Sequence, residues 1–475
     1  MTKSMTEGKP IRLIIGFAFP LFLGMLFQQF YSMVDTIIVG KFLGVEPLAG
    51  VGATGCLNFL VLGFCMGICN GFAIPIAQMF GAKKERDLRK YTANSAWLCI
   101  TFAAVITTLV VIFCRPLLTL LNTPENIFEY SYTYIVIIFC GIPCTILYNM
   151  LAAILRSLGD SKTPLIFLAI SSVINIGLDI LFIVVLHTGV EGPAMATVIS
   201  QGLSGMICFF YMKKKFAILK ISKEEWKPKL SYVKNLCFVG IPMGLQYSIT
   251  AIGSLVITSA LNGFGAVAVA GVTTAQKIAN FIVCPIEALG QTMAPYCGQN
   301  VGAGKLDRVG KGVKAASLCG FVVSAVLFVI VVLFGRQLSM LFLDKPNVQV
   351  MDYAYRYMKV CASGYCLLVL VNVVRFAIQG MGFSIFAITA GVMEMLARTL
   401  AGTVGVKLLG FTGICTANVL AWIFADAFLL PAFFYCRNRM QHIQDRKNNT
   451  IKYNHSLFEN IRRRGIIRLL GHSEQ

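Results

Sequence analysis

The sequence has few charged residues and few of the side chains that build most enzyme active sites. Asp, Glu, Lys and Arg make up only 13% of its 475 residues, and it contains four histidines and three tryptophans. No Walker motif marks an ATPase and no Asp-Asp-x-x-Asp cluster marks diphosphate chemistry. We therefore expect neither an enzyme nor a bound cofactor.

The sixteen cysteines do not form a metal-binding pattern. Nearly all lie in apolar stretches, where cysteine behaves as a small hydrophobic residue. Cys65 and Cys69, like Cys140 and Cys144, are one helical turn apart, and no Cys-x-x-Cys has a partnering histidine. A metal site is not indicated.

Hydrophobic residues make up 57% of the chain, and long apolar runs recur along it. A run of about 20 such residues crosses the hydrocarbon core as a helix. The first run lacks a small-residue cleavage site, so we expect it to be retained. The runs predict an all-α integral membrane protein with twelve transmembrane helices, at Leu13–Val39, Leu48–Phe80, Ala93–Cys114, Tyr132–Leu155, Leu165–Leu186, Gly192–Met212, Leu236–Leu261, Ala268–Cys297, Ala315–Gly335, Tyr357–Val374, Phe383–Val406 and Phe411–Cys436.

The formal net charge of +20 would suggest a nucleic-acid partner in a soluble protein. Here most basic residues lie before the first span, after even-numbered spans, or in the tail from Arg437 onward. Because cytoplasmic loops are enriched in Lys and Arg, this alternation predicts that both termini are cytoplasmic and that nucleic acid is not a partner. The basic sets are Lys3, Lys9 and Arg12; Lys83, Lys84, Arg86, Arg89 and Lys90; Arg156 and Lys162; Lys213 to Lys234; Lys305, Arg308, Lys311 and Lys314; and Arg375.

The chain repeats itself after about half its length. Pro20 and Pro242 open the first and seventh spans, and Arg156 matches Arg375. Gln78 and Gly81 match Gln299 and Gly302, and Gly192 matches Gly413. Each copy has an even number of spans, so the copies are parallel repeats. We predict a lobe at 1–212, a basic linker at 213–235, a second lobe at 236–436 and a basic cytoplasmic tail at 437–475, surface-lying or disordered.

These features together resemble the multidrug and toxic compound extrusion (MATE) family over Ile11–Cys436. The resemblance is carried by Pro20 with Asp35, the turn at 81–84, the Arg-x-x-Gly-Asp-x-x-x-Pro string at 156–164, Asn175 with Asp179, the segment 189–197, and Pro295 to Gly304. It implies two pseudo-symmetric six-helix bundles in a bacterial inner membrane. It also implies a monomeric secondary transporter that exports organic cations or drug-like molecules in exchange for protons or sodium ions by rocker-switch alternating access.

The resemblance also implies which residues handle the coupling cation in the amino-terminal lobe: Tyr31, Asp35, Asn175, Asp179 and Thr197. The chain departs from one subgroup of the family. The seventh span has Gln246 in place of an acid, and the tenth span has no carboxylate, only Arg375 at its end. A sodium site in the second lobe is therefore in doubt.

Asp35 and Asp179 are expected at a similar depth in the outer half of the membrane. An ionisable group there costs about 2.5 to 3.5 kcal/mol on insertion scales, so each is a candidate for function. If both face the lobe interior, the two carboxylates repel and can exchange a proton with one side of the membrane. Asn175 shares a helix face with Asp179. Each candidate has a structural alternative: Asp35 and Asp179 as interfacial carboxylates bonded to a neighbour, Asn175 as a packing hydrogen bond, Tyr31 as a cavity wall, and Thr197 bonded to its own helix.

Three further acidic or basic residues lie within the second copy. Glu394 and Arg398 are spaced by four in the eleventh span, which indicates either an ion pair or a substrate site. Glu287 in the eighth span has no partner nearby in sequence and is a candidate cavity acid. With Gln246, these residues form a candidate substrate cavity in the second lobe.

Two other functions compete with drug export. A lipid-linked saccharide flippase of the same superfamily would be expected to have extra spans and a charged central cavity. Twelve spans and few intramembrane Arg or Lys count against it. The other possibility is a membrane enzyme or receptor, and this chain lacks the enzyme motifs named above. Purified protein that transports nothing in liposomes would favour this possibility.

The span count makes a topological prediction. A reporter fused after Lys234 or at the carboxyl terminus should read cytoplasmic, and one fused near Asp344 should read external, because an even number of spans separates the first two positions. An external carboxyl terminus would contradict twelve spans.

Overall fold

Helices are the only regular secondary structure in the part that the computed structural model describes, residues 4–342 and 347–470, with side chains described up to residue 446. Asp344, the external reporter position, lies outside these ranges. The helices are α1 Pro10–Phe42, α2 Val45–Ala53, α3 Gly55–Gly81, α4 Glu85–Ile112, α5 Cys114–Leu120, α6 Glu125–Cys140, α7 Ile142–Ser157, α8 Lys162–Asp179, η1 Ile180–Val185, α9 Glu191–Lys215, η2 Ala217–Leu219, α10 Leu230–Asn262, α11 Ala266–Ile282, α12 Cys284–Gly302, α13 Leu306–Met340, α14 Val348–Ser363, α15 Tyr365–Gly380, α16 Ile385–Leu400, η3 Ala401–Gly405, α17 Val406–Leu409 and α18 Phe411–Leu470.

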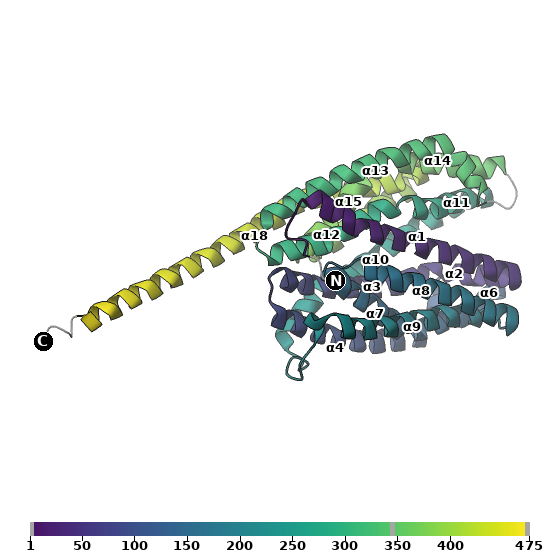
Figure 1. Ribbon diagram of the computed structural model, residues 1–475. Coiled ribbons are helices and arrows are strands. Elements are labelled where there is room, and N and C mark those ends of the chain that lie inside the picture. The colour runs from purple at the N-terminus through teal and green to yellow at the C-terminus, as the bar shows by residue number, and fades with distance from the viewer. Residues whose placement is uncertain (1–3, 343–346, 471–475) are drawn as a thin grey trace.

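The twelve-span prediction is confirmed. Within the described residues, nine helices are long and apolar enough to cross a membrane, and three bent helix pairs bring the number to twelve. The pairs are α6 with α7, α11 with α12, and α14 with α15, bent by 49°, 51° and 53°. The helix of the twelfth span, α18, does not end near Cys436 but continues to Leu470 and projects from the bundle (Figure 1). The tail is therefore helical up to Leu470, and its position on a membrane surface stays a prediction.

The order of helices repeats once. Glu85 and Leu306 begin α4 and α13, and Ile142 and Tyr365 begin α7 and α15. Both α7 and α15 are 16 residues long, and each is followed by a glycine with positive φ, Gly159 or Gly382. This register places Gln379 opposite Arg156, so the predicted match of Arg156 with Arg375 is one turn off. The domain boundaries themselves stay predictions.

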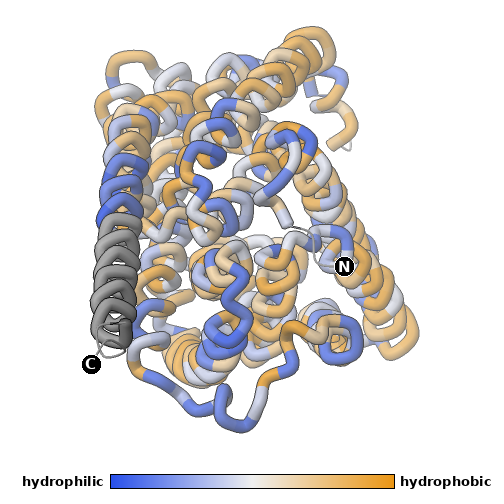
Figure 2. The backbone as a smooth tube through the Cα atoms, turned by 60° about the vertical axis from the view of Figure 1, so that its left-hand side comes forward, coloured by the Kyte–Doolittle hydropathy of each residue, from blue (hydrophilic) through white to orange (hydrophobic). Residues whose placement is uncertain are grey.

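The helices form two groups that lie one above the other in Figure 1, with α2 to α9 below and α11 to α15 above. Both ends of the drawn chain lie at the same end of the bundle. We call this the basic end, because Lys83, Lys84, the linker lysines and Lys305 lie there. Hydrophilic residues gather at this end and along the linker loop, while the helices behind are mainly hydrophobic (Figure 2).

The most extensive contact between the lobes is the crossing of α3 and α10, and it depends on glycines from both helices. A Cβ added to Gly67 would lie 2.5 Å from the carbonyl oxygen of Met243, and one added to Gly71 would lie 2.5 Å from the Cα of Gly240. Since a Cβ never comes so close to backbone, only glycine permits this approach. Small residues at helix interfaces play this role in membranes generally.

Two glutamines, Gln78 and Gln299, join the lobes at the basic end. The side-chain amide of Gln78 in α3 donates to the carbonyl oxygen of Gly380 in α15 at 3.1 Å. That of Gln299 in α12 donates to the carbonyl oxygen of Ser157 in α7 at 2.9 Å. These two bonds occupy matching places in the two copies, and we call them the glutamine clasp. They close the lobes together at the basic end.

The segment before α1 packs into this junction. Met5 is buried, and its amide donates to the Oε1 atom of Gln299 at 2.7 Å. Asn300 donates to the carbonyl oxygen of Met5, and Lys305 donates to that of Thr6. The segment therefore binds the Gln299 half of the clasp. None of these hydrogen bonds involves Gln78, the other half.

The basic linker between the lobes is anchored to α4. Arg89 forms an ion pair with Glu225 at 2.9 Å, and the indole of Trp97 donates to the carbonyl oxygen of Trp226. Burial opposes ionisation of Glu225, but hydrogen bonds from Ser222 and Arg89 outweigh it and hold the pKa of this carboxyl below its ordinary value. The linker is therefore more ordered than a freely solvated loop.

The glutamine clasp can be tested by replacing both glutamines with leucine. The double change Gln78→Leu/Gln299→Leu removes two interlobe hydrogen bonds, each worth about 0.5 to 1.5 kcal/mol. We expect faster amide hydrogen exchange in peptides spanning 78–84 and 299–305, because the lobes separate more often at this end. Gln349→Leu, on the exposed start of α14, is the control and should change neither peptide. Unchanged exchange in the double variant would show that the clasp does not hold the lobes together.

Candidate functional site

Asp35 in α1 and Asp179 at the end of α8 meet inside the amino-terminal lobe. Their carboxyl groups lie within hydrogen-bonding reach of each other. Asp179 is fully buried, and both of its oxygens and the Oδ1 atom of Asp35 lack a hydrogen-bond donor among the described residues. Two carboxylates this close repel each other unless a proton or a cation lies between them. The predicted meeting of these two residues is therefore present in the structure.

Asn175 and Thr197 extend this site. The side-chain amide of Asn175 donates to the hydroxyl of Thr197 at 3.5 Å, at the limit of a hydrogen bond, and the Oδ1 atom of Asn175 is buried without a partner in the described chain. Thr197 also bonds the carbonyl oxygen of Pro193 in its own helix at 3.0 Å, as its structural alternative predicted. The site thus offers an amide oxygen and a hydroxyl beside the two carboxylates.

Two tyrosines complete the wall of the acidic site. Tyr31 lies next to Asp35 and is bonded to Gln28. Tyr134 in α6 is buried and lies close enough to Asp35, Asp179 and Tyr31 to interact electrostatically with each of them. The sequence prediction did not include Tyr134, because no spacing links a tyrosine in the fourth span to acids in the first and fifth.

Asp179 lies where an α-helix gives way to a π-helix. The α-helical turns of α8 end at Asp179, and η1 continues as a π-helix from Ile180 to Val185. Such π segments occur frequently at functional sites. The second copy has the matching π-helix η3, but Leu400 stands before it in place of the acid. The carboxylate pair is therefore confined to the first lobe.

The second lobe buries a different group of charges. Arg375 in α15 forms an ion pair and hydrogen bond with Glu394 in α16, and Arg398 lies 3.6 Å from the other oxygen of Glu394. The predicted pair of Glu394 and Arg398 is therefore present, with Arg375 as a closer partner. Gln379 donates to Gln246 at 2.6 Å beside this group. Arg375 was assigned to a cytoplasmic loop, which is wrong, because it lies inside α15 and is buried.

Asp426 was missed by sequence reasoning. It lies in α18, is buried, and neither of its side-chain oxygens has a hydrogen-bond donor in the described part of the chain. The charges of Arg375 and Glu394 both act on it. A single acid in the apolar last span was the signal that should have found it.

Glu287 stands apart from both groups. It lies at the start of α12, next to the bend after α11, and more than a third of its surface is accessible. No ion pair of Glu287 is found within the described residues. The candidate substrate cavity of Gln246, Glu287, Glu394 and Arg398 is thus not one assembled site, because three members join the charged group and Glu287 does not.

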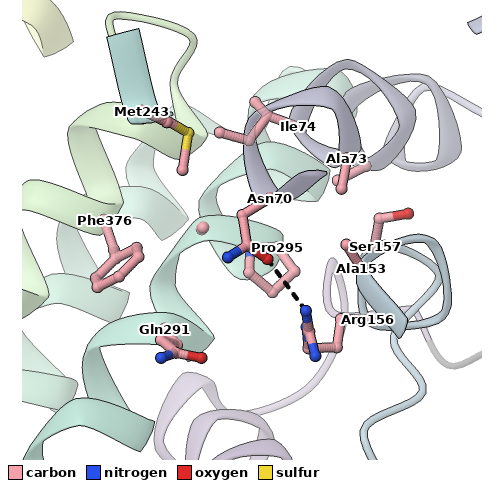
Figure 3. A pocket seen from close by; sticks show the side chains of 12 residues that line it. Asn70, Ala73, Ile74, Ala153, Arg156, Ser157, Met243, Gln291, Pro295 and Phe376 are labelled. Atoms are coloured by element: carbon pink, nitrogen blue, oxygen red, sulfur yellow. Dashed lines mark hydrogen bonds between the residues drawn. The ribbon is translucent and has the colours of Figure 1, made fainter. Parts of the chain in front are cut away.

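A small pocket of about 40 Å³ lies between the lobes, next to the glutamine clasp. Helices α3, α7, α10, α12 and α15 line it. Arg156 points toward it and donates to Asn70 at 3.1 Å, with Gln291 and Phe376 on the opposite wall (Figure 3). Arg156 lies inside α7 and not in the loop after it, which corrects its assignment to the cytoplasmic basic residues.

Comparison with known proteins identifies the family to which this chain belongs. The MatE family model matches residues 20–181 and again 242–404, once in each half of the chain. The chain belongs to the MatE family. The resemblance inferred from its motifs is thereby confirmed, and with it the class of multi-pass membrane transporters.

Individual MatE relatives agree over most of the chain. Two proteins of Bacillus subtilis (strain 168) are named "Probable multidrug resistance protein". YoeA is 28% identical over 86% of this chain and 91% of its own length, and YpnP is 31% identical over 76% and 80%. A MATE crystal structure in complex with MaL6 superposes with a TM-score of 0.85 at 22% identity, covering 94% of this chain and all of the other. That likeness shows the fold.

The ion pairs of Glu394 predict a large effect on stability. Glu394→Gln should lower the free energy of unfolding by about 3 to 5 kcal/mol, since it leaves two buried arginines without a carboxylate. The thermal midpoint of the purified protein and its yield in the membrane measure this. Glu129→Gln breaks an exposed ion pair with Arg115 and should lower stability by about 1 kcal/mol at most. Equal midpoints for the two variants would contradict a structural role for Glu394.

Proposed function

We propose that this MatE protein exports organic cations and other drug-like molecules from a bacterial cell in exchange for protons or sodium ions. The observation that carries the proposal is the pair Asp35–Asp179, two carboxyl groups within hydrogen-bonding reach of each other with no basic partner among the described residues, of which Asp179 is fully buried and Asp35 partly buried. Relatives named for multidrug resistance support the cargo class.

The site suits either coupling ion. A proton shared between the two carboxyl groups removes their repulsion directly. A sodium ion would need several oxygen ligands, and the carboxylates, the Oδ1 atom of Asn175 and the Thr197 hydroxyl are the candidates that lie together. Binding either cation from outside and losing it to the cytoplasm would drive export in the opposite direction.

Alternating access by a rocker-switch motion fits the way the lobes meet. The contacts at the basic end include the glutamine clasp and the Met5 segment, which must break for the lobes to open there. The excess of Lys and Arg supports placing this end in the cytoplasm, with the protein monomeric in the inner membrane.

A lipid-linked saccharide flippase remains the alternative. The buried residues Arg375 and Arg398, with the partly buried Arg156, weaken one argument against it, namely that the membrane interior holds few basic residues. The twelve spans still count against it, and two of the three arginines are paired with Glu394.

Neutralising the carboxylate pair tests the coupling. Asp35→Asn and Asp179→Asn should each abolish gradient-driven efflux while the protein stays folded, because Asn keeps the shape of Asp but cannot take up a proton. Substrate binding could survive. The measurement is ethidium efflux from reconstituted vesicles under separately imposed proton and sodium gradients, which also identifies the coupling ion.

Asp352→Asn is the control, because Asp352 is exposed and pairs with Arg336 at the opposite end of the bundle. It should transport like the wild type. Full efflux by the double variant Asp35→Asn/Asp179→Asn would move the coupling site to Glu287 or to the charged group of the second lobe.

A further inference from the structure

The second lobe has an open groove of about 540 Å³ on its surface, where α14 packs against α13 near the end of the bundle opposite the basic end (Figure 1). Three basic side chains of the described chain line it, Arg336, Arg356 and Lys359, together with one acid, Asp352. Arg336 is neutralised by its ion pair with Asp352 at 2.7 Å. The groove therefore keeps two positive charges, those of Arg356 and Lys359, that no ion pair among the described residues balances.

The first lobe contains a copy of the neutral ion pair. Arg115 pairs with Glu129 at 3.0 Å and lies over the ring of Tyr132. In the groove of the second lobe, Arg336 lies over the ring of Tyr355 in the same way. The duplicated unit thus supplies an arginine–acid pair beside a tyrosine, and such a pair needs no ligand to explain it.

The two unbalanced charges have no basic counterpart in the first lobe. Helices α6 and α14 are both 16 residues long. Counting from the first residue of each helix, Arg356 matches Thr133, and Lys359 matches Val136. The two charges are therefore specific to the second lobe and are not part of the helix packing that the lobes share.

The groove lies beside a lipid-facing surface of α13. The hydroxyl of Tyr355 donates to the carbonyl oxygen of Val332 at 3.2 Å, which aligns the two antiparallel helices. Lys359 lies one turn nearer the membrane centre than Tyr355 and lines the groove together with Phe328. Phe328 and Val329 are exposed apolar side chains. In a membrane, acyl chains cover such a surface.

A basic side chain at such a surface needs an anion. Charged residues within membrane spans almost always face the bundle interior or a water-filled cavity, whereas Arg356 and Lys359 are exposed. The anions that a bilayer supplies beside its hydrocarbon are lipid phosphates, and basic pockets between membrane helices bind them. Arg356 donates to Thr412 at 2.6 Å, which leaves four of its five donors for a ligand.

We propose that this groove binds the headgroup phosphate of an anionic phospholipid, held by Arg356 and Lys359 in the leaflet opposite the basic end. The guanidinium offers parallel N–H donors to the phosphate oxygens, and the ammonium, on a flexible stem, reaches toward the same headgroup. The acyl chains lie along α13 beside Phe328. A zwitterionic lipid is held less tightly, because its own cation already balances its phosphate. This site goes beyond the proposed export and does not depend on it.

The experiment measures which lipid occupies the groove, using the full chain in vesicles. Phe328→Trp places a fluorophore on the groove wall, and its emission is quenched by brominated lipids after the signal of the native tryptophans is subtracted. Brominated phosphatidylglycerol is the anionic probe, and brominated phosphatidylcholine with the same acyl chains is the zwitterionic one. Since each basic residue near a membrane surface strengthens the attraction of anionic lipid about fivefold, we expect phosphatidylglycerol to be preferred at least about tenfold.

Removing the two charges should remove the preference. In the Phe328→Trp chain, Arg356→Gln/Lys359→Gln should bring the ratio of the two lipids to about one. Lys359→Gln alone should lower the ratio about fivefold. It serves if the double variant is not recovered, because the Lys359 ammonium contacts only the ring of Tyr355, at 6.0 Å, in the described chain.

Two controls match these changes. Lys220→Gln/Lys223→Gln removes the same charge from exposed positions of the linker and should keep the preference. Val326→Trp, which replaces Phe328→Trp, places the fluorophore at an exposed position of α13 that does not line the groove, and the lipid ratio there should be near one.

A ratio near one at Phe328→Trp, or a preference that survives the loss of both charges, overturns the proposal. An equal preference at Val326→Trp would show attraction of anionic lipid to the whole protein and overturns the assigned site. Loss of the preference when inorganic phosphate replaces chloride at constant ionic strength would show that a free anion occupies the groove, which also overturns the proposal. Because transport is not measured, failure of the proposed function leaves this test unchanged.

Discussion

A polar group inside a membrane cannot form hydrogen bonds to water, so it needs a partner within the protein. This constraint applies to every part of the interior described above. The backbone satisfies it by forming helices, and serine and threonine hydroxyls satisfy it by bonding to carbonyls of their own helix. Ionised side chains cannot do so. Among the described residues, most of them lie at three places, the carboxylate pair of the first lobe, the arginine-rich group of the second, and Arg156 between them, while Glu287 stands apart. Each place resolves the constraint in a different way, and the differences separate function from structure.

The two lobes descend from one six-helix unit but differ in their electrostatics. Asp35 and Asp179 face each other without a base among the described residues, so the protein itself does not balance a charge on them there. Glu394 is balanced permanently by Arg375 and Arg398. A permanently balanced group can stabilise a lobe but is poorly suited to exchanging ions. Duplication thus supplied two similar scaffolds, and only the first retains unbalanced acids at the π-helical break.

Hydrophobic run length predicted the number of spans, because crossing the bilayer imposes a minimum length on each helix. The family resemblance selected Asp35, Asn175, Asp179 and Thr197, and the structure brings them together. Contacts between distant spans could not be predicted from the sequence. Nothing in it indicates that Tyr134 lies near Asp35, or that Arg375 lies closer to Glu394 than Arg398 does. Arg156 and Arg375 were misplaced because a basic residue near the end of a run looks the same whether it lies in a loop or in the last turns of a helix.

The glutamine clasp has the form of an isologous contact. Gln78 reaches from the first copy to Gly380 of the second, and Gln299 reaches back to Ser157 of the first. A dimer of two separate six-helix chains would make the same bond twice, and a single substitution would alter both. Once the copies are joined in one chain, each bond can change alone. The Met5 segment, which binds Gln299 and leaves Gln78 without such a contact, shows that this freedom has been used to make the two halves of one symmetric junction unequal.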